Sequence, residues 1–275
     1  MNISEHRGSF IQEMSRRGYS KNSIKNYTSC LEVFLSKIDK DHPKNINEMD
    51  IKGFLNNCIR PNTQRNYHSA IKLFYDICFN QKQKFKNIPY TKAEKRLPIV
   101  LSVDEVQRMF DVCVNLKHKV ILSLLYSCGL RVSELINLKW EHIDRARMVI
   151  NIIGAKGNKD RQVMLSAVLI PVLECYFLEY KSKVYVLNGQ FGLKYSAGSV
   201  LQVMKQLGAK ANIGKRVWTH QMRHNSFTHM VENGVDINLI QKLAGHNNVK
   251  TTLIYTHISG NLISKIQSPL SNIKI

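Results

Sequence analysis

Residues 219–257 read THQMRHNSFTHMVENGVDINLIQKLAGHNNVKTTLIYTH and bring together side chains suited to phosphate chemistry. The stretch contains the spacing H-x-x-R, from His220 to Arg223, and the spacing H-x8-Y, from His246 to Tyr255. An Arg fork matches two phosphate oxygens, a His exchanges protons near neutral pH, and a Tyr phenol can serve as a covalent nucleophile. The stretch therefore predicts phosphate chemistry that needs no metal ion, and a fold that gathers these four side chains.

The composition is that of a folded, basic protein. The chain has 275 residues, of which 44% are hydrophobic, enough for one large domain or two ordinary ones. Its 40 Lys and Arg against 20 Asp and Glu give a net charge of +20, which favours a polyanionic partner through counterion release. Basic residues outnumber acidic ones on both sides of residue 97, so we expect both halves to contact nucleic acid. A generically basic protein is the alternative interpretation of the charge alone.

The cysteines and the amino terminus predict a cytoplasmic protein. The six cysteines form no C-x-x-C pair and no metal-ligand spacing, and most sit among apolar residues, as expected of buried free thiols in a reducing compartment. The start, MNISEHRGSF, lacks the apolar core of a signal peptide, and no run approaches the ~18 apolar residues of a membrane span.

The first third of the chain predicts a small helical bundle followed by a linker. Ser20 precedes apolar residues at helical spacing up to Leu35, and a second such pattern runs from about Asn62 to Tyr75, with a shorter helix expected between them. We assign residues 1–82 to this bundle. The basic stretch QKQKFKNIPYTKAEKR, residues 81–96, shows no sustained apolar period, and we place an interdomain linker at 83–97.

The second domain, residues 98–258, is predicted to be helical around one β-hairpin. Ser102 with Glu105 has the form of a capping box, which marks the start of a helix. Further apolar helical patterns occur at 120–126, from about 130, and at 199–207, 227–231 and 236–243. Residues 148–153 and 161–165 are strand-like and are separated by GAKGNKD. The expected fold class is mainly α with a small antiparallel β-hairpin or sheet, in two domains.

Two cations upstream are candidates for the same site. Arg131 follows Gly129 in the first turn of a predicted helix, where a cation opposes the helix dipole. Glu134, three residues on, can orient Arg131 or offset its charge; a purely structural ion pair is the alternative. Lys156 lies at the hairpin tip with Gly on both sides, where a mobile ammonium can contact a phosphate or act as a general acid; a solvated turn Lys is the alternative.

Taken together, these residues resemble the catalytic domain of tyrosine recombinases, most of all the compact Xer-like and transposon or phage integrases. The resemblance rests on six positions in order within CGLRVSEL, GAKGNKDRQVML, THQMRH and LAGHNNVKTTLIYTH: Arg131, Lys156, His220, Arg223, His246 and Tyr255. It covers residues 97–260 by motif and extends, by size and basic helical pattern, to a SAM-like core-binding domain at 1–82. The aromatic Phe227 stands one position later than is usual in the family, and Ala244 replaces a usual Leu, which affects local packing.

The resemblance implies a site-specific DNA recombinase that needs no cofactor, metal ion or ATP. Tyr255 would attack a scissile phosphate and form a 3′-phosphotyrosyl bond. Arg131 and Arg223 would bind the non-bridging oxygens, and His246 would donate to the phosphate. His220 would accept the Tyr255 proton or orient the phosphate, and Lys156 would protonate the leaving 5′-oxygen. Glu134 would support Arg131 without itself being catalytic.

The resemblance also implies double-stranded DNA sites as partners, a synaptic tetramer on that DNA, and a nucleoid-associated location without membrane contact. The tail, residues 259–275, carries a short apolar stripe, Leu262, Ile263 and Ile266, which would dock on a neighbouring protomer; packing on its own domain is the alternative. Two other functions stay open. They are a nicking-closing enzyme of the type IB topoisomerase kind and a catalytically silent DNA-binding accessory protein.

Overall fold

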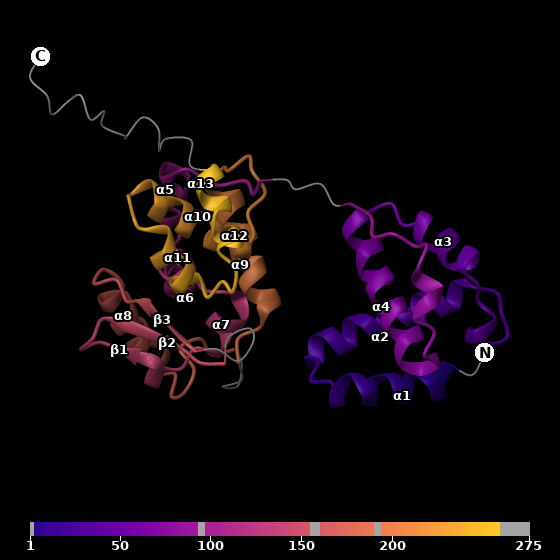
Figure 1. The fold of residues 1–275 in the computed structure, drawn as a ribbon. Helices are drawn as coiled ribbons and strands as arrows, with labels where there is room; N and C mark the ends of the chain where they lie inside the picture. Colours follow the sequence, from indigo (N-terminus) through magenta and orange to yellow (C-terminus); the bar gives the residue numbers. More distant parts are fainter. Residues whose placement is uncertain (1–2, 93–96, 155–159, 190–193, 259–275) are drawn as a thin grey trace, which may run out of the picture. The chain divides into compact units, whose positions relative to one another are not determined.

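The computed structural model describes residues 3–92, 97–154, 160–189 and 194–258 of the chain (Figure 1). They fall into two compact units that divide between Lys95 and Arg96. Both units are mainly helical, and the second also holds a small antiparallel sheet, which confirms the predicted fold class.

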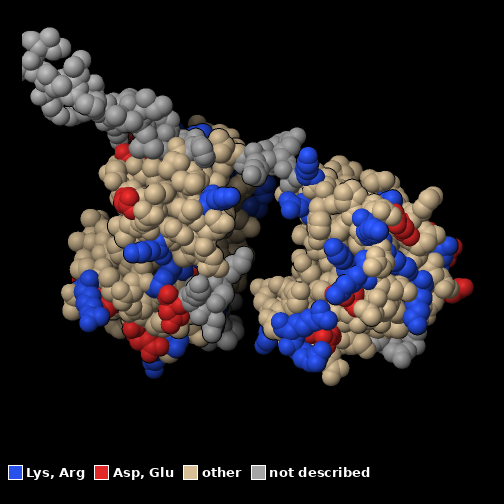
Figure 2. All heavy atoms as spheres, viewed as in Figure 1, with Lys and Arg blue, Asp and Glu red and all other residues tan. Residues whose placement is uncertain are grey.

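The first unit is a helical bundle of α1 (Ile3–Arg16), α2 (Lys21–Lys37), α3 (Glu48–Asn56) and α4 (Pro61–Phe79), with a short 3-10 turn, η1 (Pro43–Asn45). Local chemistry sets the helix starts: the Ser20 hydroxyl accepts from the Ser23 amide at 3.1 Å, and Asn47 with Asp50 forms a capping box. The apolar faces of all four helices meet in one core, which includes Phe10, Leu31, Phe34, Ile51, Phe54, Ile71 and Phe74. On the visible face of this unit, Lys and Arg outnumber Asp and Glu (Figure 2).

The residues that follow α4 remain packed on the first unit. Phe85, at the end of η2 (Lys82–Phe85), and Ile88 are buried in its core although they lie within the predicted linker at 83–97. His68 Nε2 donates to the Ile88 carbonyl at 2.9 Å, and the Tyr90 ring lies 4.0 Å from the His68 ring. Contacts with this unit therefore continue past the predicted start of the linker as far as Thr91, whose hydroxyl donates to Gln64 Oε1 on α4.

The second unit surrounds one apolar core with helices. They are α5 (Val103–Asp111), α6 (Leu116–Ser127), α7 (Val132–Asn137), α8 (Leu169–Tyr180), α9 (Ala197–Lys210), α10 (Thr219–Glu232), α11 (Ile237–Ala244), α12 (Val249–Thr252) and α13 (Ile254–Ile258). The predicted capping box is confirmed, since the Glu105 amide donates to Ser102 Oγ at 3.1 Å and the Ser102 amide donates to Glu105 Oε2 at 2.7 Å.

The sheet has the strand order β1 (Ile143–Asp144), β2 (Val149–Ile152) and β3 (Arg161–Met164), all antiparallel. The predicted hairpin is confirmed as β2 and β3, with Ile150 opposite Val163. β1 was not predicted because two residues after the 3-10 turn η3 (Trp140–His142) are too short for a sequence period. Alternation buries Ile150, Ile152 and Val163 against the core.

The first residues of the second unit are hydrogen-bonded to one face of α10. Gln221 Nε2 donates to the Ile99 carbonyl at 3.1 Å, and Asn225 Oδ1 accepts from the Leu101 amide at 3.0 Å. His229 Nε2 donates to the Leu101 carbonyl at 2.9 Å, which leaves Nδ1 to accept from the Tyr126 hydroxyl at 2.7 Å. Because these α10 residues recur every four positions, they lie on one face of the helix and hold residues 99–101 against it.

The cysteines differ in part from expectation. All six are free thiols, but only Cys113 and Cys128 are buried, and Cys175 on α8 is exposed because it faces away from the core. Within the described ranges, no helix has the length and apolarity that a membrane crossing requires.

Candidate active site

Arg131 stands at a sharp turn where α6 gives way to α7. Gly129 has a φ of +58°, a conformation that glycine adopts without steric cost, and Arg131 is the residue that caps α7. The Arg131 amide donates to Glu134 Oε2 at 2.7 Å, and its guanidinium donates to Glu134 Oε1 at 2.8 Å. The Glu134 carboxylate thus accepts from a free amide at the start of α7 and also orients the Arg131 guanidinium.

A second arginine, Arg161, also binds the Glu134 carboxylate. It donates to both carboxylate oxygens of Glu134, at 2.7 and 2.8 Å, from the first position of β3. Burial raises the pKa of Glu134, but hydrogen bonds from Arg161 and from the Arg131 amide outweigh that effect and hold the pKa well below its usual range. The carboxylate therefore stays ionised at neutral pH and partly offsets two positive charges.

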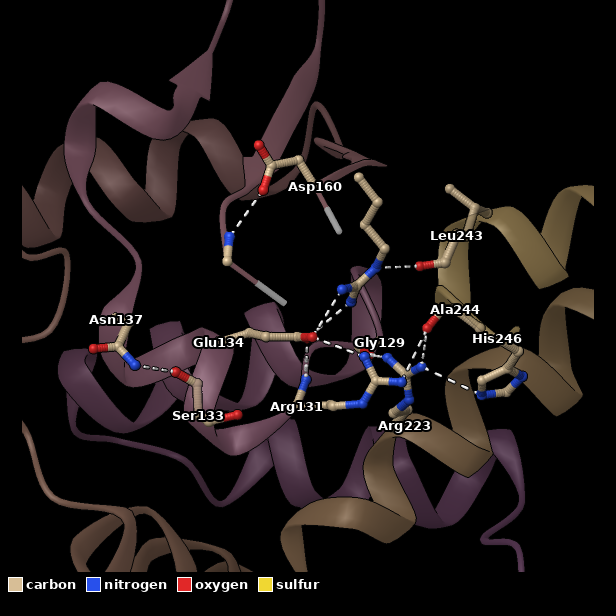
Figure 3. A network of polar contacts seen from close by, with 12 residues as sticks. Gly129, Arg131, Ser133, Glu134, Asn137, Asp160, Arg223, Leu243, Ala244 and His246 are labelled. Carbon is tan, nitrogen blue, oxygen red and sulfur yellow. Dashed lines mark hydrogen bonds and ion pairs between the residues drawn. The ribbon is translucent and has the colours of Figure 1, made fainter. Parts of the chain in front are cut away.

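The carboxyl end of α11 faces Arg131 and Arg223 (Figure 3), and it also binds Arg161. The Ala244 carbonyl accepts from Arg131 at 3.3 Å and also from Arg223, while the Leu243 carbonyl accepts from Arg161 at 2.7 Å. The last carbonyls of a helix lack intrahelical partners and carry the negative end of its dipole. Gly245, with a φ of +60°, ends α11 in the left-handed conformation and leaves these carbonyls free to meet the guanidinium groups.

Arg223 comes from the middle of α10 and is 1% exposed. Its guanidinium donates to the carbonyls of Gly129 and Ala244, which ties the α6–α7 turn to the end of α11. Burial, followed by the nearby charge of Arg131, lowers the pKa of Arg223. The group remains charged at neutral pH, because a guanidinium starts from a pKa above 12.

His246 lies in the loop after α11, beside Arg223. His246 Nδ1 is 3.0 Å from the hydroxyl of Thr252, and Nε2 makes a long contact of 3.5 Å with Arg223. Since a guanidinium only donates, Nε2 accepts in that contact and Nδ1 carries the proton. Burial and the charges of Arg223 and Arg131 lower the pKa of His246 to about 4, so the ring is neutral at pH 7.

Tyr255, on α13, is 1% exposed and packs among aromatic rings. Its ring stacks on His246 at 6.3 Å between centroids and an interplanar angle of 17°, and lies 5.5 Å from Phe227. Burial raises the pKa of Tyr255 to about 12, and the charges of Arg223 and Arg131 act in the opposite direction. A phenol of this kind needs a base before it can act as a nucleophile.

Phe227, the aromatic shifted by one position in the sequence, packs at the centre of the site. Its ring lies 4.8 Å from the Arg223 guanidinium carbon, within the range of a cation–π contact. A Cβ at Gly129 would come within 2.6 Å of the ring, so the glycine is required for close packing as well as for its φ. The ring therefore supports the turn that carries Arg131, the Arg223 guanidinium and Tyr255 together.

His220 occupies the exposed start of α10. Its ring lies 4.6 Å from that of His224, and its pKa is lowered by desolvation and by the charges of Arg223 and Arg131. The structure thus gathers five of the six predicted positions, namely Arg131, His220, Arg223, His246 and Tyr255. Lys156 lies outside the described residues. In the described part of the chain, no group of three or more His, Cys, Asp or Glu is arranged to hold a metal ion.

Three residues of this site, Arg161, His224 and Thr252, were not predicted from the sequence. Arg161 stands two positions before the buried Val163 on β3, so the two side chains lie on the same, inner face of the strand. His224 is adjacent to Arg223 in the quoted motif, but adjacency gave no sign of its contact with Tyr255. Thr252 is fully buried without any apolar pattern that marks it.

The chain matches the models and members of one protein family over most of its length. Residues 100–261 match the model of the phage integrase family, and residues 7–84 match the model of its N-terminal SAM-like domain. The chain is 35% identical over 260 residues to the tyrosine recombinase XerA of Pyrococcus horikoshii, covering 91% of this chain and 88% of that protein. It is 30% identical over 282 residues to the tyrosine recombinase XerD of Staphylococcus aureus, covering 94% of each.

The fold is similar to that of lambda integrase. A crystal structure of a lambda integrase tetramer bound to a Holliday junction gives a TM-score of 0.78 at 15% identity, covering 96% of this chain and 80% of that one. Identity this low supports the fold alone, whereas the family match and the Xer relatives extend over nearly the whole chain. On these grounds the chain belongs to the phage integrase family and is a site-specific DNA recombinase of the tyrosine type.

Proposed function

We propose that this recombinase cuts DNA by attack of the Tyr255 phenol on a scissile phosphate. The attack forms a 3′-phosphotyrosyl bond and releases a 5′-hydroxyl, so the bond energy is kept in the protein–DNA link and rejoining needs neither ATP nor a metal ion. The observation that carries this proposal is the convergence of Arg131 and Arg223 on the Ala244 carbonyl, beside the stack of Tyr255 and His246.

The two arginines bind the non-bridging oxygens of the phosphate. Fixed guanidinium groups neutralise the charge that builds in the transition state and do not have to reorganise during the reaction. Glu134 and the carbonyls of α11 hold these groups in place before DNA arrives. His246 adds a hydrogen bond to the phosphate once its proton moves from Nδ1 to Nε2, His220 handles a proton or orients the phosphate, and Lys156 protonates the leaving 5′-oxygen.

The DNA is held by both parts of the chain. Residues 1–82 act as a core-binding domain and residues 98–258 as the catalytic domain. Residues 83–97 act as the connection, of which Phe85 and Ile88 pack on the core-binding domain. The net charge of +20 supports this division, because each duplex phosphate that a Lys or Arg neutralises releases counterions. The recombinase works at the nucleoid as a tetramer on two double-stranded sites, in the manner of the lambda integrase tetramer, with the tail at 259–275 docking on a neighbouring protomer.

A nicked duplex tests the chemistry. Duplexes from the DNA that flanks the gene, nicked just beyond the scissile phosphate, should trap the protein covalently, with EDTA present as well as without it. Tyr255→Phe should form no adduct. An adduct that survives this change, or the absence of any wild-type adduct, contradicts the proposal. Strand exchange between two labelled duplexes, as against relaxation of supercoils alone, separates recombination from nicking-closing activity.

A further inference from the structure

His224 is the side chain that connects His220 with Tyr255. Its ring lies 4.6 Å from the His220 ring at an interplanar angle of 78°, and 5.8 Å from the Tyr255 ring at 53°. Among the described residues, no other ring is recorded in contact with both. His220 is the imidazole that the family resemblance implies as a base. The His224 ring therefore contacts both this imidazole and the tyrosine.

The His224 ring has an unfilled hydrogen-bonding position. Its Nδ1 atom is buried and has no hydrogen-bond partner. A buried polar atom without a partner costs stability, so an orphan of this kind beside a reactive phenol is better explained by a role in the reaction than by packing. His224 itself is half-buried, and four titratable or charged groups surround it: His220 and Arg223 on α10, His246 after α11, and Tyr255 on α13.

The electrostatic surroundings keep His224 unprotonated. Burial, followed by the neighbouring His220 and Arg223, lowers the pKa of His224 to about 4, so the ring is neutral at pH 7 and keeps a free lone pair. The phenol beside it holds its proton firmly, because burial raises the pKa of Tyr255 to about 12. A base in contact with the phenol and a route for the proton towards solvent are both needed.

We propose that His224 accepts the phenolic proton of Tyr255 during DNA cleavage and passes it to the exposed His220. The Tyr255 O–H bond breaks as an N–H bond forms on His224, the phenolic oxygen bonds to phosphorus, and the bond from phosphorus to the 5′-oxygen breaks. The leaving oxygen takes its proton from a separate acid. This proposal rests on the proposed function, in which Tyr255 is the nucleophile.

Single-turnover cleavage of the nicked duplex tests the role of His224. His224→Gln should slow covalent adduct formation by about 100-fold, the lower range for loss of a general base, and leave DNA affinity within about 3-fold. His118→Gln is the matched control, because His118 is also half-buried, on α6 and next to Lys210. His220→Gln should slow cleavage less than His224→Gln. The reverse order assigns the proton directly to His220 and overturns the proposal.

A sulfur-substituted duplex shows on which side of the phosphate His224 acts. When sulfur replaces the bridging 5′-oxygen, the thiolate leaves without a proton, so defects in the leaving-group acid disappear and defects on the nucleophile side remain. His224→Gln should stay slow on this duplex. If His224→Gln cleaves either the sulfur-substituted or the ordinary duplex at the wild-type rate, the proposal is overturned. His224→Asn replaces the Gln variant if the latter lowers the melting temperature.

Adduct formation by the wild type and by His224→Gln distinguishes the role of Tyr255 from that of His224. If the wild-type protein forms no adduct at Tyr255, the proposed function fails. If the wild type forms the adduct and His224→Gln forms it as fast, the proposed function stands and only the role of His224 is overturned.

Discussion

Arg161 donates to both carboxylate oxygens of Glu134, at 2.7 and 2.8 Å, and the two side chains are 7% and 5% exposed. The pair joins β3 to α7, and through the Leu243 carbonyl it also reaches the end of α11. The strand that leads out of the hairpin is thus fixed to the two segments that carry Arg131 and His246. The same interaction holds the fold together and sets the spacing of the site.

Loss of the Glu134 charge should lower both stability and activity. Glu134→Gln leaves Arg131 and Arg161 without a counter-charge, and removing one partner of a buried pair costs about 3 kcal/mol or more. Urea unfolding measures the change. Glu141→Gln is the control, because Glu141 pairs with Lys139 at a side-chain exposure of 67%, and exposed pairs contribute under about 1 kcal/mol. Equal effects of the two changes would contradict a structural role for Glu134.

The two site arginines should not tolerate lysine. Arg131→Lys and Arg223→Lys each keep the charge but lose the fork that binds two oxygens at once, so cleavage of a nicked duplex should fall by about 100-fold or more. DNA affinity, measured by gel shift, should change little, because many other cations contact the duplex. Arg145→Lys, whose side chain is 56% exposed in the turn between β1 and β2, should cleave at the wild-type rate.

Substitutions at Gly129 and Gly154 distinguish the cost of a positive φ from the cost of a steric clash. Both have positive φ, but a Cβ at Gly154 meets nothing within 4 Å, whereas at Gly129 it lies 2.6 Å from Phe227. Gly154→Ala should lower the free energy of unfolding by about 1 kcal/mol and Gly129→Ala by about 3 kcal/mol. Adding Phe227→Leu to Gly129→Ala should recover about 1 kcal/mol relative to the sum of the single changes. Strict additivity would show that the ring and the glycine are not in contact.

Acid should destabilise the protein through two histidines. The pKa values of His224 and His246 are both lowered from 6.5 to about 4, so below pH 6.5 the unfolded chain binds protons that the folded chain does not. The free energy of unfolding is highest above that pH and should fall by about 1 to 2 kcal/mol for each histidine between pH 6.5 and 5. Urea titrations at several pH values, on the wild type and on the variant with both histidines changed to Gln, measure how much of this fall the two histidines cause. An equal fall in the free energy of unfolding in the variant would contradict the prediction.

Local patterns were enough to predict several features of the second unit. The capping box at Ser102 and the hairpin at 148–165 depend on chemistry within a few positions of one another, and the motif residues lie in short segments that resemble those of the family. The contacts of Arg161, His224 and Asn225 could not be predicted in this way, because each joins segments far apart in the sequence. Asn225, for example, accepts from the Leu101 amide, 124 residues away.

The limits of the first unit show the same division between local and distant information. Basic residues dominate the stretch from 81 to 96, and this composition predicts a linker. Two isolated apolar side chains, Phe85 and Ile88, nevertheless find places in a core formed by four helices. Only the packed structure reveals that such places exist.

The burial of Tyr255 has a consequence for the safety of the genome. A side chain that is 1% exposed offers no surface to a phosphate, so α13 or its neighbours must move before the phenol can touch DNA. While Tyr255 stays enclosed, its phenol cannot attack the phosphates of DNA that the protein meets. We expect cutting only after DNA binding has supplied the free energy to open the aromatic packing around Tyr255.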